Sequence, residues 1–287
     1  MNLSVALRLG RVSNQPTVWT NVLAGVVLAG ASGATTVSVI ALITGMAFLY
    51  TAGMFLNDAF DADFDRRHRP ERPIPSGETT IANVFTAGFS FMAVGLVLIA
   101  AASIPNGGGL AASCAGIVLA GLIVLYDWWH KENDFGPLLM GLCRMLAYLT
   151  AALAVAGTLN MAVIGAALVA LSYLIGLTYV AKQETLGRVR NLWPLGFLAV
   201  PFVYGLPTAS RDPASAVVLL GLLVWVLYAL SFLRAGQRAI GKSVGYLIAG
   251  ICLLDAFFVA AQAPILAACA VGAFALTLCF HRVVPGT

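Results

Sequence analysis

The chain has 287 residues, of which 60% are hydrophobic and only 10% charged, and its mean hydropathy is +0.93. Soluble domains carry about 25% charged residues, so this composition excludes an ordinary cytosolic enzyme, a disordered tail and a nucleic-acid-binding domain. Long apolar stretches indicate a polytopic membrane protein instead. The formal net charge of +4 is small, and the positions of the charges are more informative than their sum.

Apolar segments divide the whole chain, each near the roughly 20 residues that a helix needs to cross the hydrocarbon core. They cover residues 16–34, 36–58, 79–103, 110–128, 136–157, 160–181, 191–207, 214–233, 244–261 and 264–281. The last two could instead be one span plus a re-entrant piece, so the pattern predicts nine or ten helices. Backbone polar groups must be paired inside a membrane. We therefore expect an all-α transmembrane bundle that forms one domain over residues 1–287.

The cations gather in alternate connections. Of the 16 Lys and Arg residues, 14 fall at the two ends of the chain or in every second connection, whereas Arg211 lies in an opposite connection and Arg144 inside a segment. The positive-inside rule places the cation-rich side in the cytoplasm. We expect an integral membrane protein, of a bacterial inner membrane, with a cytoplasmic N-terminus.

The acids are also biased to this side. Ten of the 12 lie at the cytoplasmic ends of the second to seventh segments. A solvated surface would spread acids over many connections, so the bias indicates a site. These ten residues are Asp58, Asp61, Asp63, Asp65, Glu71, Glu78, Asp127, Glu132, Asp134 and Glu184.

The densest acidic cluster lies at the end of the second segment. Asn57, Asp61 and Asp65 are spaced i, i+4, i+8, and Asp58 adjoins them, so a continuing helix would place them on one face. Like charges repel at this spacing unless a cation lies between them. Hard oxygen ligands on one face suit Mg²⁺. Asp63 points elsewhere on such a helix and is not expected to bind.

The cluster has two other interpretations. An EF-hand loop starting at Asp61 needs a glycine and a carboxylate at the positions that Arg66 and Arg72 occupy, so it is excluded. A charged helix end that anchors the span in water remains an alternative. The arginines of residues 66–72 follow from the positive-inside rule alone, but the adjoining acids do not. Carboxylates, a metal and arginines together suit a pyrophosphate.

These residues resemble the UbiA superfamily of intramembrane prenyltransferases. The family's first motif, NDxxDxxxD, is matched by Asn57, Asp58, Asp61 and Asp65, and the RPxPSG that follows it by residues 72–77. Residues 8–19 look like the usual start of its first helix. Tyr126 and Lys131 resemble its Tyr…Lys signature.

The resemblance implies a helical bundle whose central cavity opens laterally to lipid, with cytoplasmic-side aspartates that hold Mg²⁺ and an isoprenyl diphosphate. The implied reaction ionises the allylic C–O bond, and Mg²⁺ and basic residues stabilise the departing pyrophosphate. A hydrophobic acceptor, expected to be aromatic, then captures the carbocation. The surroundings are the lipid bilayer, and the sequence specifies no protein partner.

The resemblance also implies roles for individual residues. Metal ligands would be Asn57, Asp58, Asp61, Asp65 and Glu184, and the catalytic group would be Asp58, Asp61, Asp65 and Lys182. The diphosphate would be bound by Arg11, Arg72, Lys131, Lys182 and Arg144. Aromatic faces can shield a carbocation, and the cavity candidates are Phe60, Tyr126, Tyr148 and Tyr179. Trp128 and Trp129 fit an interfacial belt better.

The chain departs from the family at the end of the sixth segment. There the family carries a second motif, DxxxD, whereas this chain has Lys182 where an acid is expected and keeps only Glu184. A protonated lysine cannot ligate Mg²⁺ but can pair with a phosphate. Either a cation replaces one metal, or the diphosphate chemistry is lost, or the second acid set comes from Asp127, Glu132 or Asp134.

The departure resembles a divergent, EboC-like branch of the superfamily. The Gly-Pro-x-x-Met-Gly-x-Cys-Arg run of that branch is matched by residues 136–144, which end at Arg144. Arg144 and Asp255 lie inside segments, where an ion costs about 2.5–3.5 kcal/mol and lines a cavity or finds a partner. A mutual salt bridge is one expectation. The other places Arg144 above the cavity, where it reaches the diphosphate or a polar acceptor group.

Two rival functions belong to other classes of protein. The CDP-alcohol phosphotransferases also place aspartates at membrane helix ends, but residues 66–77 lack the glycine and aspartate run that they need. A lipid or isoprenoid carrier derived from the same fold is the alternative, because the second motif is depleted. Transporters concentrate polar sites near the bilayer midplane, whereas these carboxylates lie at its edge.

Overall fold

The computed structural model describes residues 1–30, 34–131, 133–186, 193–234 and 237–284, without the side chains of residues 184–186, 234, 237 and 238. Within these ranges every regular element is a helix. The elements are α1 (Leu3–Leu9), η1 (Val12–Asn14), α2 (Gln15–Leu28), α3 (Thr36–Phe60), α4 (Ala62–His68), α5 (Ile81–Ser103), η2 (Ile104–Asn106), α6 (Gly109–Trp129), α7 (Gly136–Ala156), α8 (Met161–Leu186), η3 (Trp193–Ala199), α9 (Val200–Ala209), α10 (Pro213–Ser231), η4 (Phe232–Arg234), α11 (Gln237–Ala260) and α12 (Pro264–His281).

Each of the ten predicted segments contains helix. Eight helices of the described ranges are long and apolar enough to cross a membrane: α3, α5, α6, α7, α8, α10, α11 and α12. The first predicted segment is shorter than expected, because α2 has 14 residues and spans about 21 Å. The seventh is the apolar stretch Trp193–Ala209, and its predicted start at residue 191 lies outside the described residues. The last two segments are separate helices that are each long and apolar enough to cross a membrane, which favours two spans over one span plus a re-entrant or interfacial piece.

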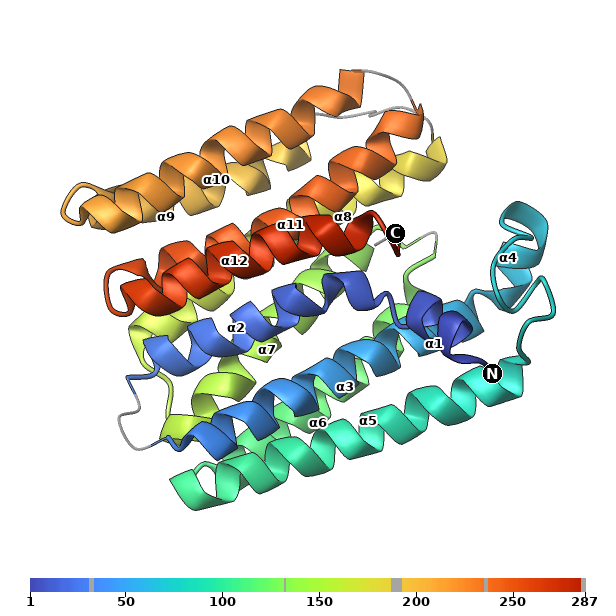
Figure 1. Cartoon of the computed structure of the whole chain (residues 1–287), viewed down its shortest axis with the longest axis horizontal. Helices are drawn as coiled ribbons and strands as arrows, with labels where there is room; N and C mark the ends of the chain where they lie inside the picture. Colours follow the sequence, from blue (N-terminus) through green and yellow to red (C-terminus); the bar gives the residue numbers. More distant parts are fainter. Residues whose placement is uncertain (31–33, 132, 187–192, 235–236, 285–287) are drawn as a thin grey trace.

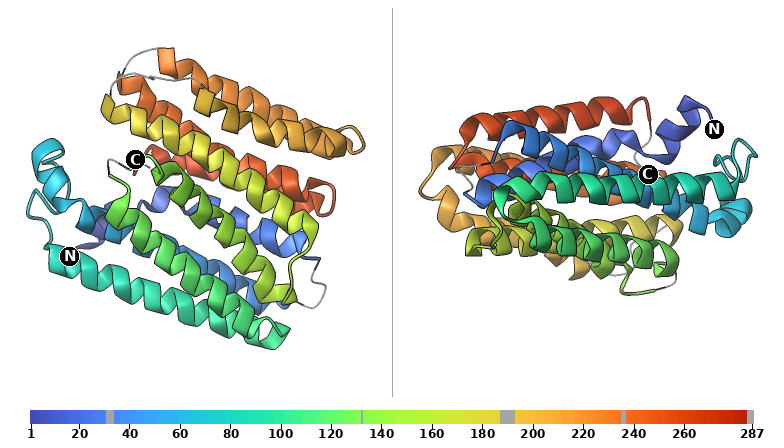
Figure 2. Two further views of the ribbon diagram at one scale, coloured as in Figure 1. Left: turned by 180° about the vertical axis from the view of Figure 1, so that it is seen from behind. Right: turned by 90° about the horizontal axis from the view of Figure 1, so that it is seen from below.

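The long helices lie side by side in one bundle (Figures 1 and 2). The N-terminus, α1 and α4 lie at one end of it, together with the start of α5 (Figure 1). The acidic end of α3 points to the same end (Figure 1). The bundle therefore gathers the motif region and the N-terminal segment, which lie about 50 residues apart in sequence, at one end.

Close packing holds α3, from which the motif starts, against α5. A Cβ on Gly95 of α5 would lie 2.8 Å from the carbonyl oxygen of Gly45 on α3, so only glycine permits this approach. In α11, 83% of the membrane-length window is buried, which makes it the most enclosed of the eight spans. By contrast, Trp128 and Trp129 at the end of α6 are exposed. They face outward, as the belt interpretation predicts, and do not line the cavity described below.

Candidate active site

The acidic motif spans a bend between two helices. α3 ends at Phe60 and α4 begins at Ala62, yet the amides of Asp61 and Asp65 still donate to the carbonyls four residues before them, at 2.9 Å each. Asp58, Asp61 and Asp65 are only 7%, 5% and 1% exposed. The predicted helical spacing thus places the three carboxylates inward. Asp63 points to solvent and pairs with Arg66 at 2.5 Å, so it lies outside the cluster, as predicted.

Arg72 joins the two ends of the motif. Its Nη1 lies 2.8 Å from Asp58 Oδ1 and 3.2 Å from Asp65 Oδ2, so one guanidinium serves two buried carboxylates. The desolvation of Asp65 raises the pKa of its carboxyl above the usual value, and Arg72 offsets this only in part. The proline-rich loop of the RPxPSG motif therefore returns its arginine to the acids that precede it.

Arg11 reaches the same carboxylates from the N-terminal segment. Its Nη2 lies 3.3 Å from Asp58 Oδ1 and 3.5 Å from Asn57 Oδ1. Its backbone has φ +40° and ψ +51°, the left-handed region, which costs a residue with a Cβ about 1–2 kcal/mol. A strained backbone persists where surrounding contacts determine it, and here the strain accompanies a guanidinium directed at the motif.

Asp61 is paired from the end of α6. Lys131 Nζ lies 3.0 Å from Asp61 Oδ2 and 3.4 Å from the centre of the Phe64 ring, which combines an ion pair with a cation–π contact. His130 Nε2 is 3.7 Å from the same oxygen. Burial lowers the pKa of His130 despite the nearby carboxylate, so its ring is mainly neutral near pH 7. The sequence had not indicated His130 as a neighbour of the motif.

A fourth buried carboxylate completes the cluster. Asp127 on α6 is 3% exposed, and its Oδ1 accepts a hydrogen bond of 3.2 Å from Asn57 Nδ2. Asp127, Glu132 and Asp134 are the three acids that could replace the second motif, and of these Asp127 lies at the cluster. Asp134 is exposed, and Glu132 lies outside the described residues.

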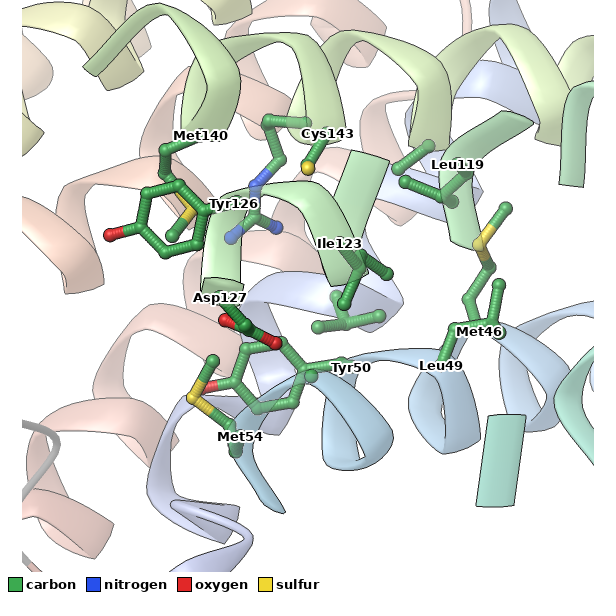
Figure 3. Close-up of a pocket in the computed structure, with 14 residues that line it drawn as sticks. Met46, Leu49, Tyr50, Met54, Leu119, Ile123, Tyr126, Asp127, Met140 and Cys143 are labelled. Carbon is green, nitrogen blue, oxygen red and sulfur yellow. The ribbon is translucent and has the colours of Figure 1, made fainter. Parts of the chain in front are cut away.

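A cavity lies directly beneath this cluster and is bounded by α2, α3, α6 and α7. Its volume is about 100 Å³, and it is open at its mouth. Tyr126, Asp127, Met54 and Tyr50 lie toward one side, and Leu119 and Met46 lie toward the other (Figure 3). The lining residues are Val18, Met46, Leu49, Tyr50, Gly53, Met54, Leu119, Ile123, Tyr126, Asp127, Met140, Cys143, Arg144 and Ala147.

The aromatic predictions have mixed outcomes. Tyr126 lines the cavity. Phe60 instead packs edge-on against Phe85, with ring centres 5.0 Å apart, and Tyr148 is fully buried and donates a hydrogen bond to Asp255. Tyr179 is likewise absent from the cavity wall. Phe60, Tyr148 and Tyr179 do not line this cavity, and their assignment to a carbocation site stays a prediction.

Tyr50 is the lining aromatic residue that sequence analysis missed. It lies seven residues before Asn57 on the same helix, and its hydroxyl accepts a hydrogen bond of 3.1 Å from Asn14 Nδ2. Residues seven apart share a helix face, so this spacing was the signal that could have found it. The face of α3 that carries the motif also lines the cavity.

Arg144 lies on the cavity wall, away from the acidic motif. Its Nη1 donates to the carbonyl oxygen of Thr17 at 3.3 Å and to Asn21 Oδ1. Asn21 Nδ2 in turn donates to Asp255 at 2.9 and 2.7 Å. The expected direct salt bridge between Arg144 and Asp255 is therefore wrong, because an amide lies between them. The structure places Arg144 with the cavity and gives it no contact with the motif carboxylates.

Lys182 contacts a loop. Its Nζ donates to the carbonyl oxygen of Asn133 at 2.5 Å, so the end of α8 is tied to the α6–α7 connection. The side chain of Glu184 lies outside the described residues. The predicted roles of Lys182 in diphosphate binding and catalysis, and of Glu184 as a ligand, stay predictions.

The donor set fits Mg²⁺. The side-chain oxygens Asp65 Oδ1 and Asp127 Oδ2 are buried and accept no hydrogen bond from the described residues. Within the described part of the chain, no three His, Cys, Asp or Glu side chains lie close enough to hold a metal by themselves. Mg²⁺ commonly takes only one or two carboxylates and completes its shell with water and phosphate. The residues therefore suit an ion shared with a bound phosphate group.

The chain is similar in sequence to enzymes named digeranylgeranylglyceryl phosphate synthase. A digeranylgeranylglyceryl phosphate synthase of Methanopyrus kandleri is 29% identical over 77% of this chain and 78% of its own length. The synthases of Metallosphaera sedula and Methanoregula boonei are 34% identical, but the chain spans only 19% and 36% of their lengths.

Solved structures share the fold. A UbiA homologue from Aeropyrum pernix superposes with a TM-score of 0.67 over 88% of this chain and 98% of its own, at 13% identity. A UbiA homologue from Archaeoglobus fulgidus, bound to DMAPP and Mg²⁺, has a TM-score of 0.52 over 97% of this chain and 99% of its own, at 17% identity. The model of the UbiA prenyltransferase family matches residues 18–285. The chain belongs to the UbiA prenyltransferase family.

Proposed function

We propose that the protein transfers a prenyl group from an isoprenyl diphosphate to a hydrophobic acceptor in a Mg²⁺-dependent reaction at the cytoplasmic side of the membrane. One observation carries the proposal: a cluster of buried carboxylates and cations lies directly above an apolar cavity, with Asp127 contributing to both. An isoprenyl diphosphate has the same division, because a charged head continues into an apolar tail.

The cations of the cluster would bind the pyrophosphate. Arg11 and Arg72 present guanidinium groups that can each hold two phosphate oxygens, and Lys131 supplies a point charge. Preplaced positive charge stabilises a leaving group as its negative charge develops. Bound Mg²⁺ would add further positive charge at the same oxygens. We assign Asn57, Asp58, Asp61 and Asp65 to hold it.

The cavity would hold the prenyl tail and the acceptor. Its apolar side, around Leu119 and Met46, suits a hydrocarbon chain and excludes water from the reactive carbon. Tyr50 and Tyr126 lie on the side of the cavity that carries Asp127 (Figure 3). Their ring faces can stabilise positive charge on the allylic carbon after the C–O bond breaks.

The relatives support the class of donor. UbiA homologues from Archaeoglobus fulgidus have been solved with DMAPP and Mg²⁺ and with GPP and Mg²⁺. The relatives with known activity are synthases of digeranylgeranylglyceryl phosphate, a prenylated lipid. The acceptor in our proposal is hydrophobic, and an aromatic ring is the leading candidate because it is a good nucleophile toward a carbocation.

The test compares matched aspartate variants of the purified protein in lipid nanodiscs. Several isoprenyl diphosphates are supplied with a membrane lipid extract and Mg²⁺, and the products are followed by mass spectrometry. Asp61→Asn removes a buried carboxylate of the cluster, whereas Asp63→Asn removes an exposed one. Loss of product only with Asp61→Asn supports the proposal. Equal turnover by both variants would contradict the site assignment.

A carrier without transferase activity is the second candidate. Lys182 occupies the position of a second-motif acid and binds the Asn133 carbonyl, which is the observation that favours it. The same nanodiscs distinguish the two functions. Diphosphate binding without any prenylated product from the lipid extract would support the carrier.

A further inference from the structure

The buried carboxylates at the acidic end of the bundle are not equally paired. Asp58 contacts Arg11 and Arg72, Asp65 contacts Arg72, and Asp61 contacts Lys131. Asp127 makes no salt bridge within the described part of the chain, although it is only 3% exposed. A buried carboxylate without a cation is costly. The ionised form of this residue is therefore stabilised by a positive charge placed beside it, and no salt bridge within the described chain supplies one.

The geometry of Asp127 leaves one oxygen for that partner. Asn57 Nδ2 donates to Oδ1 at 3.2 Å, which fixes the orientation of the carboxylate against the motif. Oδ2 is buried and accepts no hydrogen bond from the described residues. Asp61 and Asp58 are near enough to interact with it electrostatically. The free oxygen thus belongs to a residue that lines the cavity and lies within electrostatic range of carboxylates assigned to Mg²⁺.

At the end of α8 the family carries two aspartates, whereas this chain has Lys182, which ties down the α6–α7 connection through the Asn133 carbonyl. That same connection directly follows the helix that carries Asp127. Lys182, which stands where the family has an acid, and Asp127 are therefore linked through the α6–α7 connection.

We infer that Asp127 is a Mg²⁺ ligand that supplies, from α6, a carboxylate missing from the end of α8. The inference rests on the proposed diphosphate chemistry and adds the source of a ligand to it. Mg²⁺ needs only one or two carboxylates when phosphate and water complete its shell, so a single residue suffices. If Asp127 only oriented Asn57, an amide in its place would serve equally well.

Metal binding tests the inference without reference to turnover. Mn²⁺ replaces Mg²⁺, and its free concentration is followed by electron paramagnetic resonance during titration of the protein, with and without inorganic pyrophosphate. Asp127→Asn keeps the shape of the side chain and can still accept from Asn57. We expect it to weaken Mn²⁺ binding in the presence of pyrophosphate by about tenfold or more. Asp127→Glu should retain more affinity than Asp127→Asn.

The control is Asp63→Asn, which removes one negative charge from the same end of the bundle but from an exposed position. It should bind Mn²⁺ as the wild type does. If Asp127→Asn also binds as the wild type does, Asp127 is not a ligand and the inference is wrong. If the wild type itself binds no Mn²⁺ in the presence of pyrophosphate, the result contradicts the proposed function and not only the role of Asp127.

A second measurement needs no variant, so it remains valid if Asp127→Asn does not fold. Fe²⁺ in the Mg²⁺ site, with ascorbate and hydrogen peroxide, cleaves the backbone beside its ligands. We expect cleavage in the wild type both at the α3–α4 junction and at the end of α6 near Asp127. Cleavage at the α3–α4 junction alone would overturn the inference.

Discussion

Arg144 and Asp255, two charged residues in membrane-length helices, are linked through the side-chain amide of Asn21. The amide oxygen accepts from Arg144, and the amide nitrogen donates to both oxygens of Asp255 at 2.9 and 2.7 Å. Thr20 and Tyr148 also donate to Asp255. A buried carboxylate and a cavity-lining guanidinium are thus joined by a neutral group, which lets α2 connect α7 and α11.

Asn21→Leu should destabilise the protein. The substitution removes an acceptor from Arg144 and a donor from Asp255 without removing either charge, and an unsatisfied buried group costs about 1–3 kcal/mol. Thermal unfolding in detergent micelles measures the effect. Replacing all three residues, as Asn21→Leu with Arg144→Met and Asp255→Leu, should recover part of the loss because no ion remains buried. A wild-type melting temperature for Asn21→Leu alone would contradict this account.

Arg72→Lys should weaken pyrophosphate binding by about tenfold. A lysine carries the charge and could pair with Asp58 and Asp65, which contact a single nitrogen of Arg72 at 2.8 and 3.2 Å. It cannot, however, hold two phosphate oxygens through a planar fork. Calorimetry with pyrophosphate and Mg²⁺ gives the affinity. Arg66→Lys is the matched control, because Arg66 forms an exposed pair with Asp63. Equal effects of the two substitutions would mean that charge alone matters.

The pH dependence of stability should depend on Asp65. Burial raises the pKa of its carboxyl above the unfolded value, which Arg72 offsets only in part. The protonated form therefore favours folding below the unfolded pKa, and this contribution is lost as pH rises through the folded pKa. Without Mg²⁺, Asp65→Asn should gain stability relative to the wild type as pH rises from acid to neutral. A loss of stability of Asp65→Asn relative to the wild type over this range, measured by thermal melts, would show that Arg72 dominates instead.

Gly53→Leu should shorten the donors that the protein accepts. Gly53 lines the cavity, and a Cβ there would already lie 3.0 Å from Ile123 Cγ2, so a larger side chain must occupy the cavity. We expect kcat/KM to fall by about tenfold more for geranylgeranyl diphosphate than for dimethylallyl diphosphate. Gly121→Leu on α6 is the control, because nothing lies within 4 Å of its added Cβ. Equal losses for both donors would place the tail elsewhere.

Much of the fold could be predicted from hydropathy, because a span must be about as long as the membrane is thick. The burial of polar side chains in α2 could not. Gln15 and Asn21 are buried by contacts to α3 and α11. Such contacts depend on which helices become neighbours, and the sequence pattern of a single segment does not contain that information.

In the candidate site, too, local spacing predicts some residues and misses the contacts made between distant segments. The carboxylates of residues 57–65 share a helical face, and that spacing was enough to place them together. The partners of Arg144 and Lys182 come from α2 and from the α6–α7 connection, which no local spacing relates to them. The tyrosines show the same limit, since Tyr148 and Tyr50 are both in apolar helices but only Tyr50 faces the cavity.

The most direct measurement is an experimental structure of the protein with Mn²⁺ and an unreactive isoprenyl thiodiphosphate. The anomalous signal locates the metal, and density for the tail locates the cavity in use. We predict a Mn²⁺ peak beside Asp58, Asp61 and Asp65, with the hydrocarbon chain running past Tyr50 toward Leu119. Metal and diphosphate bound away from these carboxylates, or a tail outside this cavity, would contradict the account.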